Sequence, residues 1–153
     1  MNTEAKLVEL GLELPEAPKP GGLYKPMLVI DGLAYLSGHG PYGSDGTMQL
    51  GQVGTVVDQE TAYLAARQTG LAMLATIKAN IGSLDRVKRV VKLLGLVNSA
   101  PDFYNHPAVI NGCSELFAEV FGDDAGVGTR SAFGAAALPG NISVEIEGIF
   151  EVE

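Results

Sequence analysis

The hydrophobic periodicity of this chain switches between extended and helical several times, and the order of those switches restricts the fold more than any other sequence feature. Asp31-Gly32 separates two apolar runs, which predicts a β-hairpin over residues 27–37. The later elements expected are a helix from Asp58 to Gly82, a strand over 87–97, a helix opened by Pro107, and strands near 129–137 and 142–152. We therefore predict the order ββαβαββ, an α+β fold in which a single layer of two main helices packs on one β-sheet.

The N-terminal segment, residues 1–22, is expected to precede this unit as a short helix and an extended connector. Thr3 and Gly11 are a plausible start and end of the helix, and three prolines and two glycines in 14–22 forbid a helix there. The whole chain, 1–153, is expected to be a single domain. It has one cysteine, no signal-peptide pattern in residues 1–14 and no apolar run of membrane-spanning length, so we expect a cytoplasmic protein without an internal disulfide.

Composition restricts the partners. Apolar residues make up 46% of the chain and charged residues only 18%. A single helix layer covers one face of the sheet, and the strands are too apolar for the other face to stay in water, so we expect subunits to pack there. The net charge of −8 argues against a binder of nucleic-acid backbones. It leaves room for a small anion, because one local arginine can hold a carboxylate.

Arg130 and Glu145 are the main candidates for chemistry. Arg130 opens an apolar strand without an opposite charge nearby in sequence, so it pairs either with a carboxylate ligand or with a distant acidic residue. Glu145 alternates with apolar residues and with other glutamates, a pattern that a solvated strand face also explains. A turn centred on Pro139-Gly140 would pair the last two strands, set Gly134 opposite Glu145, and leave space for a small anion between Glu145 and Arg130.

The other candidate motifs favour structural interpretations. Residues 38–43 match G-x-G-x-x-G, but no helix follows before about residue 58, so a glycine-rich turn fits better than a dinucleotide site. His39 and His106 have no ligand-spaced partners, which argues against a metal site. His39 is placed in a loop after a strand and His106 at a helix start. Cys113 falls on the apolar stripe of a helix and is expected to behave as a small hydrophobe.

Several short motifs together resemble one known family. They are Gly22-Leu23-Tyr24, Tyr35-Leu36-Ser37-Gly38, Arg130-Ser131, Leu138-Pro139 and Val144-Glu145-Ile146-Glu147. From about Lys19 onward the chain resembles the reactive-intermediate deaminase family, called RidA, YjgF or endoribonuclease L-PSP. That resemblance implies a chorismate-mutase-like fold with a mixed sheet, assembled as a homotrimer with its sites in the clefts between subunits.

The resemblance also implies an activity: hydrolysis of 2-imino or enamino acids to 2-oxo acids and ammonia, without metal or cofactor. It implies that Arg130 grips the substrate carboxylate, that Glu145 positions or protonates through water, and that Tyr24, Ser37 and the Gly38 backbone surround the imine.

The chain departs from the family pattern at Ala132, where the family has a cysteine, at His39, where it has a glutamine, and in a longer 98–128 region. These departures leave the substrate open. A non-catalytic binding protein for a 2-oxo acid or related carboxylate is the alternative, and the net charge makes an endoribonuclease the least favoured reading.

Overall fold

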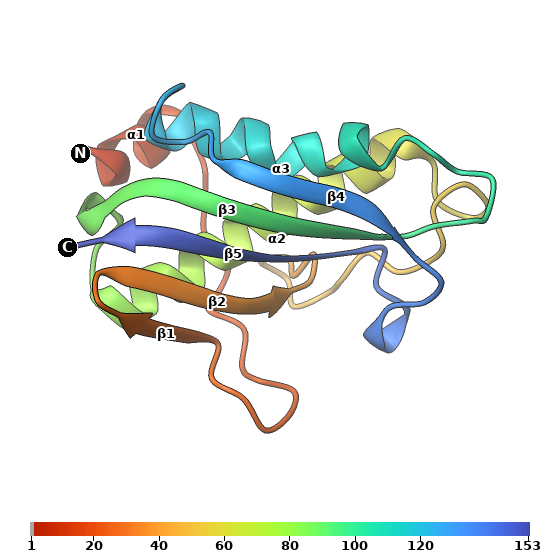
Figure 1. Ribbon diagram of the computed structural model, residues 1–153, viewed down its shortest axis with the longest axis horizontal. Coiled ribbons are helices and arrows are strands. Elements are labelled where there is room, and N and C mark those ends of the chain that lie inside the picture. Colours follow the sequence, from red (N-terminus) through yellow and green to blue (C-terminus); the bar gives the residue numbers. More distant parts are fainter. Residues whose placement is uncertain (1) are drawn as a thin grey trace.

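The computed structural model describes residues 2–153; Met1, part of the expected N-terminal segment, lies outside the described residues. One five-stranded sheet in the order β1-β2-β5-β3-β4 has the two long helices on one face (Figure 1). The elements are α1 (Thr3–Glu9), β1 (Met27–Ile30), β2 (Leu33–His39), α2 (Gln59–Ile81), β3 (Val87–Asn98), α3 (His106–Phe121), β4 (Thr129–Ala135) and β5 (Val144–Val152), with 3₁₀ turns at Leu84–Arg86 and Pro139–Asn141. The predicted order ββαβαββ is confirmed.

The residues expected to begin or end the two long helices and to form the hairpin turn take up those positions in the structure. Asp58 caps α2, its side chain accepting a hydrogen bond from the Thr61 N–H at 2.7 Å, and Gly82 ends the helix at φ 90°. Asp31 and Gly32 both have positive φ, 50° and 77°, as a tight hairpin turn between β1 and β2 requires. Pro107 lies in the first turn of α3, where its missing N–H costs nothing.

The core lies between the sheet and the helices. Apolar side chains of β3 and β5 pack against α2 and α3, and the stripe expected on α3 is buried as predicted. On α2, by contrast, every residue from Thr69 to Ile77 is buried rather than one face. The N-terminal segment explains why α2 is buried all round: Leu7 of α1 and Pro15 of the connector are buried, and this segment runs along the side of α2 that the sheet and α3 leave free.

The last two strands are not neighbours, and the predicted hairpin between them is wrong. β4 pairs in parallel with β3, and β5 pairs antiparallel with β3 on its other side, so β3 lies between them. The cause is the order β3-α3-β4: a helical crossover brings the next strand back parallel to the first. β5 then occupies the remaining edge of β3, and Gly134 is not opposite Glu145.

The face of the sheet turned away from the helices, which no other element of the described residues covers in Figure 1, carries exposed apolar side chains, as expected. Leu28, Ile30, Tyr35 and Phe133 expose between 41% and 52% of their surface, and nothing in residues 2–153 covers them. We call this the open face. No helix within the described chain is long and apolar enough to cross a membrane.

Candidate functional site

A cavity of about 600 Å³ lies where β2 ends and β5 begins, and we call it the Glu145 pocket. Its walls come from the connector, the end of β2, the loop after it and the turn before β5. They include Lys19, Tyr24, Gly38, His39, Gly40, Tyr42, Met48, Pro139, Gly140, Ile142 and Glu145. Residues from three stretches of the sequence, within 16–26, 38–48 and 139–145, thus meet in one hollow.

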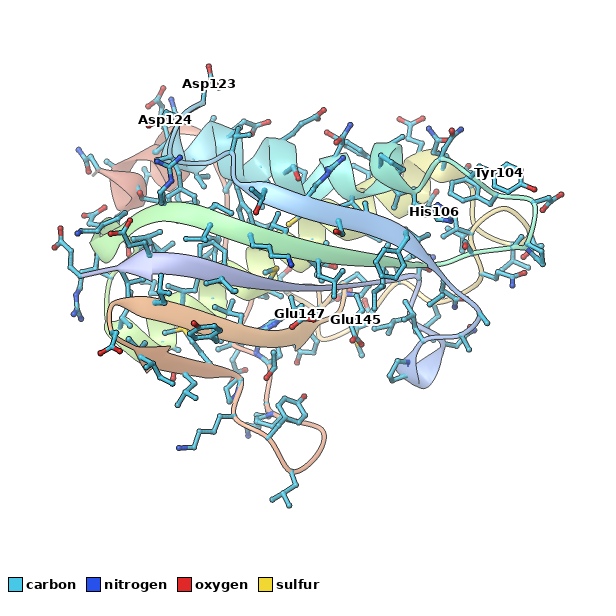
Figure 2. The ribbon with its side chains drawn as sticks, in the orientation of Figure 1. Tyr104, His106, Asp123, Asp124, Glu145 and Glu147 are labelled. Atoms are coloured by element: carbon cyan, nitrogen blue, oxygen red, sulfur yellow. The ribbon has the colours of Figure 1, made fainter. Side chains whose placement is uncertain are left out.

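Glu145 reaches this cavity because Gly38 has no side chain. A Cβ on Gly38 would lie 2.6 Å from Oε2 and 2.9 Å from Cδ of Glu145, so any larger residue would displace the carboxyl. Figure 2 shows Glu145 and Glu147 next to each other beside the end of β2. Burial raises the pKa of Glu145, and the charge of Glu147 raises it further. A half-buried carboxyl with a raised pKa is suited to hold and transfer a proton.

Tyr24 and Ser37 are arranged differently. Tyr24 lines the Glu145 pocket with about half of its surface exposed, and its hydroxyl accepts a hydrogen bond from the Gly21 N–H at 3.2 Å. Ser37 directly precedes Gly38 on β2, but its hydroxyl donates a hydrogen bond to the carbonyl oxygen of Lys25 at 2.6 Å. The structure therefore brings Tyr24 and Gly38 to Glu145, whereas the Ser37 hydroxyl ties β2 to the segment before β1.

His39 is the last residue of β2, so its placement in a loop was wrong. Its ring is buried. Nδ1 lies 2.6 Å from the carbonyl oxygen of Ser37 and Nε2 lies 2.7 Å from the hydroxyl of Thr76. Because a carbonyl only accepts, Nδ1 donates, and in the neutral ring Nε2 accepts from Thr76. Burial lowers the pKa of His39, although the hydrogen bond to Ser37 opposes it. His39 forms part of the pocket wall with both nitrogens already bonded inside the chain.

Arg130 lies elsewhere, on the helix-facing side of the edge strand β4. One terminal nitrogen donates to the Ser114 hydroxyl at 3.0 Å and the other to the carbonyl oxygen of Pro107 at 3.3 Å. Both acceptors are neutral. Within residues 2–153 the guanidinium forms no ion pair, so the salt bridge to a distant acidic residue is not present.

A second cavity, of about 210 Å³, opens beside this arginine between α3 and residues 126–129. Asn111 and Ser114 line it, and neither was singled out from the sequence. They are three residues apart on α3, the spacing that puts side chains on one helix face, but nothing in the sequence tells which strand that face meets. A small hollow lined by Arg130, the Asn111 amide and the Ser114 hydroxyl can bind a carboxylate.

The predicted anion gap between Arg130 and Glu145 does not exist within one chain. Residues paired across β3 point to the same side of the sheet, and Glu145, Leu96 and Phe133 form such a row on the open face. Arg130 pairs with Leu93, three residues before Leu96 on β3, and this row is on the other face, where Leu93 is buried under the helices. Ala132 is two residues further along β4 and shares the side of Arg130. Arg130 and Ala132 thus form one partial site, and Glu145, Tyr24 and Gly38 another.

The mixed sheet with two main helices on one face defines a chorismate-mutase-like α+β fold, and comparison with known proteins agrees. The YjgF/chorismate mutase-like family, "putative endoribonuclease", matches residues 4–150. Protein TCP17 of Trypanosoma cruzi is 37% identical over 148 residues, which is 97% of this chain and 92% of that protein.

Solved structures lead to the same group. A protein of unknown function from Agrobacterium tumefaciens is 41% identical, with a TM-score of 0.90 over 99% of this chain and 92% of the other. A "putative endoribonuclease" from Shewanella oneidensis is 31% identical, with a TM-score of 0.94 over 99% and 100%. RidA from an Antarctic Psychrobacter is 25% identical, with a TM-score of 0.64 over 90% and 94%. This chain belongs to the YjgF/RidA family.

Proposed function

We propose that this protein hydrolyses small 2-imino or enamino acids to 2-oxo acids and ammonia. The observation that carries the proposal is an arginine, Arg130, held only by neutral acceptors, together with Glu145, a half-buried carboxyl whose pKa is raised. The first suits the carboxylate of an amino-acid-derived substrate, and the second suits proton transfer. Membership of the family that includes a protein named RidA supports it.

The chemistry requires water to add to the C=N carbon. The protonated imine R–C(=NH₂⁺)–COO⁻ gains a hydroxyl group from water, a proton moves to nitrogen, and the C–N bond breaks to give R–CO–COO⁻ and NH₄⁺. In the proposal Glu145 takes a proton from the attacking water and returns it to the departing nitrogen. Arg130 orients the substrate and balances the charge of its carboxylate.

We further propose that the complete site forms between subunits of a homotrimer. Arg130 and Glu145 lie on opposite faces of the sheet, so they contact one small molecule only if they come from two copies of the chain. Arg130 lies on an edge strand, where another subunit has access to it. The exposed apolar side chains of the open face support such an assembly.

The activity is tested by generating 2-iminopropanoate from alanine with an amino-acid oxidase and following its loss. Wild-type protein should accelerate that loss, and Arg130→Ala and Glu145→Gln should each abolish the acceleration. Glu151→Gln is the matched control, because Glu151 lies on the same strand and pairs only with Lys88 at the surface. Imine loss no faster than in buffer would refute the proposal.

Shared sites are tested by mixing subunits of the two inactive variants, unfolded together and refolded. An interface that takes Arg130 from one variant and Glu145 from the other is fully wild type, so random mixing should restore about one quarter of the sites. No recovery in proven hybrids would mean that both residues act from one chain, against the shared site.

A binding protein for a 2-oxo acid is the second candidate. Ala132 in place of the family's cysteine, and His39 with both nitrogens already engaged, favour it, because they remove two groups that would contact substrate. Glu145→Gln separates the two functions: it should spare binding of 2-oxobutanoate and remove turnover.

Salt-dependent RNA binding, which the net charge of −8 disfavours, would instead support the endoribonuclease interpretation.

A further inference from the structure

A row of small residues leads from Arg130 along the helix-facing side of β4. Arg130, Ala132 and Gly134 alternate on the strand, so they share one side at steps of about 6.6 Å. Ala132 contributes only a methyl group and Gly134 only backbone. The row therefore adds little side-chain bulk between the Arg130 guanidinium and the end of β4, and we call it the small-residue track; Ala132 itself is partly buried against the core.

His106 and Ser99 stand at the far end of this track. A Cβ on Gly134 would lie 2.7 Å from Nε2 of His106 and would collide with the Ser99 hydroxyl, so Gly134 makes room for both. Nε2 and the Ser99 oxygen are 3.1 Å apart, within hydrogen-bond distance. Figure 2 shows His106 at the end of β4 and Tyr104 beyond it.

Both polar groups are held in place. The Ser99 N–H donates to the carbonyl oxygen of Ala135 at 3.2 Å, which fixes Ser99 against β4. The Phe103 ring packs edge-on against the His106 ring, with 5.6 Å between centroids. When Nε2 donates to the Ser99 oxygen, the hydroxyl hydrogen of Ser99 is free for an oxygen atom of a ligand. His106 then acts as a positioning residue that orients this donor.

We infer that Ser99 and His106 receive the distal end of the substrate whose carboxylate Arg130 holds, and that they select 2-imino acids with a second carboxylate on a five-carbon skeleton. This rests on the proposed function. The Arg130 guanidinium bonds the carbonyl oxygen of Pro107, the residue next to His106, and the Ser114 hydroxyl further along α3, so it lies beside the helix that begins at His106. A three-carbon acid ends over Ala132, whereas a five-carbon dicarboxylate crosses it and reaches Ser99.

The competing explanation is structural: the Ser99–His106 hydrogen bond would only fasten the segment between β3 and α3. Ligand selectivity separates the two, because a fastening role affects all ligands alike. The ligands are 2-oxoglutarate and 2-oxopentanoate, which share the 2-oxo acid head and the five-carbon chain and differ in the distal carboxylate.

Calorimetry on the full-length protein tests the assignment. Wild type should bind 2-oxoglutarate about tenfold more tightly than 2-oxopentanoate, a difference typical of one well-placed hydrogen bond to a charged group. Ser99→Ala and His106→Gln should lose that preference while affinity for 2-oxopentanoate stays within about twofold. Asn105→Ala is the control, because its side chain bonds Gln59 instead. Thermal melts verify that the variants fold.

Equal affinity of wild type for the two acids would overturn the assignment, and so would a preference that survives in both variants. Turnover is a separate readout. A carboxylate preference without imine hydrolysis would refute the proposed activity and leave this assignment standing, whereas hydrolysis without the preference would do the reverse. If neither acid binds, Arg130 is no carboxylate site and the assignment falls with it.

Discussion

The close approach of Gly38 to Glu145 allows a sharp test of how the pocket works. In Gly38→Ala the new methyl carbon would lie 2.6 Å from Oε2 and 3.1 Å from Cγ of Glu145, well inside van der Waals contact. The obstructed atoms are the end of a flexible side chain, so Glu145 can rotate away. Holding it off its preferred rotamer costs about 0.5–1.5 kcal/mol, which bounds the expected loss in the free energy of unfolding.

Turnover should suffer more than stability. A displaced carboxyl no longer transfers the proton, and general acid–base catalysis is worth about 10²–10⁴ in rate. We expect Gly38→Ala to lower kcat for 2-iminopropanoate about a hundredfold, which corresponds to about 2.7 kcal/mol in the barrier. The measurement is initial-rate kinetics beside a urea denaturation curve.

The double variant with Glu145→Gln decides whether the effect passes through Glu145. If the methyl group acts only by moving that carboxyl, Gly38→Ala adds nothing once the carboxyl is gone, and the two effects are not additive. Additive losses, or wild-type kcat in Gly38→Ala, would refute the reasoning, because the glycine would then matter for some other reason or not at all.

Other substitutions probe the two partial sites and the assembly. Arg130→Ala should abolish 2-oxo acid binding in calorimetry at a stability cost of about 1 kcal/mol per hydrogen bond, and Arg130→Lys should not rescue it, since an ammonium lacks the two-pronged geometry. Because the folded pKa of Glu145 is raised above its ordinary 4.5, wild-type stability falls as pH rises through the window between the two values. Glu145→Gln should therefore melt at a higher temperature than wild type near pH 8 and lose that advantage below about pH 4.5. Glu147→Gln, by removing a like charge, should lower the pKa of Glu145 and narrow that window in the same melts. Phe133→Asp should shift the proposed trimer to monomer in light scattering, while Leu64→Asp, on the solvent side of α2, leaves it assembled.

Local signals predicted the elements well because each depends on neighbouring residues. Asp58 and Gly82 bound α2 through a side-chain cap and a positive φ, and Asp31-Gly32 fixes a two-residue turn. None of these inferences requires knowing what the element packs against.

Strand pairing could not be predicted in the same way. Period 2 tells which residues share a face but not which strand is adjacent, so Arg130 and Glu145 were assigned to a hairpin that β3 interrupts. The prediction that His39 lies in a loop was wrong for a related reason. Ser37 and Gly38 are weak strand formers, but pairing with β5 extends β2 through them, and an irregular register lets Leu36 and His39, three residues apart, both be buried.

The two partial sites share a property that stability alone would not favour. The chain has 18 acidic residues to 10 basic ones, yet the fold holds Arg130 with a hydroxyl and a carbonyl rather than a carboxylate. A carboxylate at Ser114 would stabilise the guanidinium better, but it would cancel the charge that an anionic ligand needs. Glu145 is likewise set beside a like charge and partly removed from water, where its anion is disfavoured. Charged residues without the partners that would stabilise them most are expected where binding and proton transfer, rather than folding, determine the arrangement. Their positions on opposite faces of the sheet then make assembly a condition of the proposed chemistry, since neither partial site has both groups.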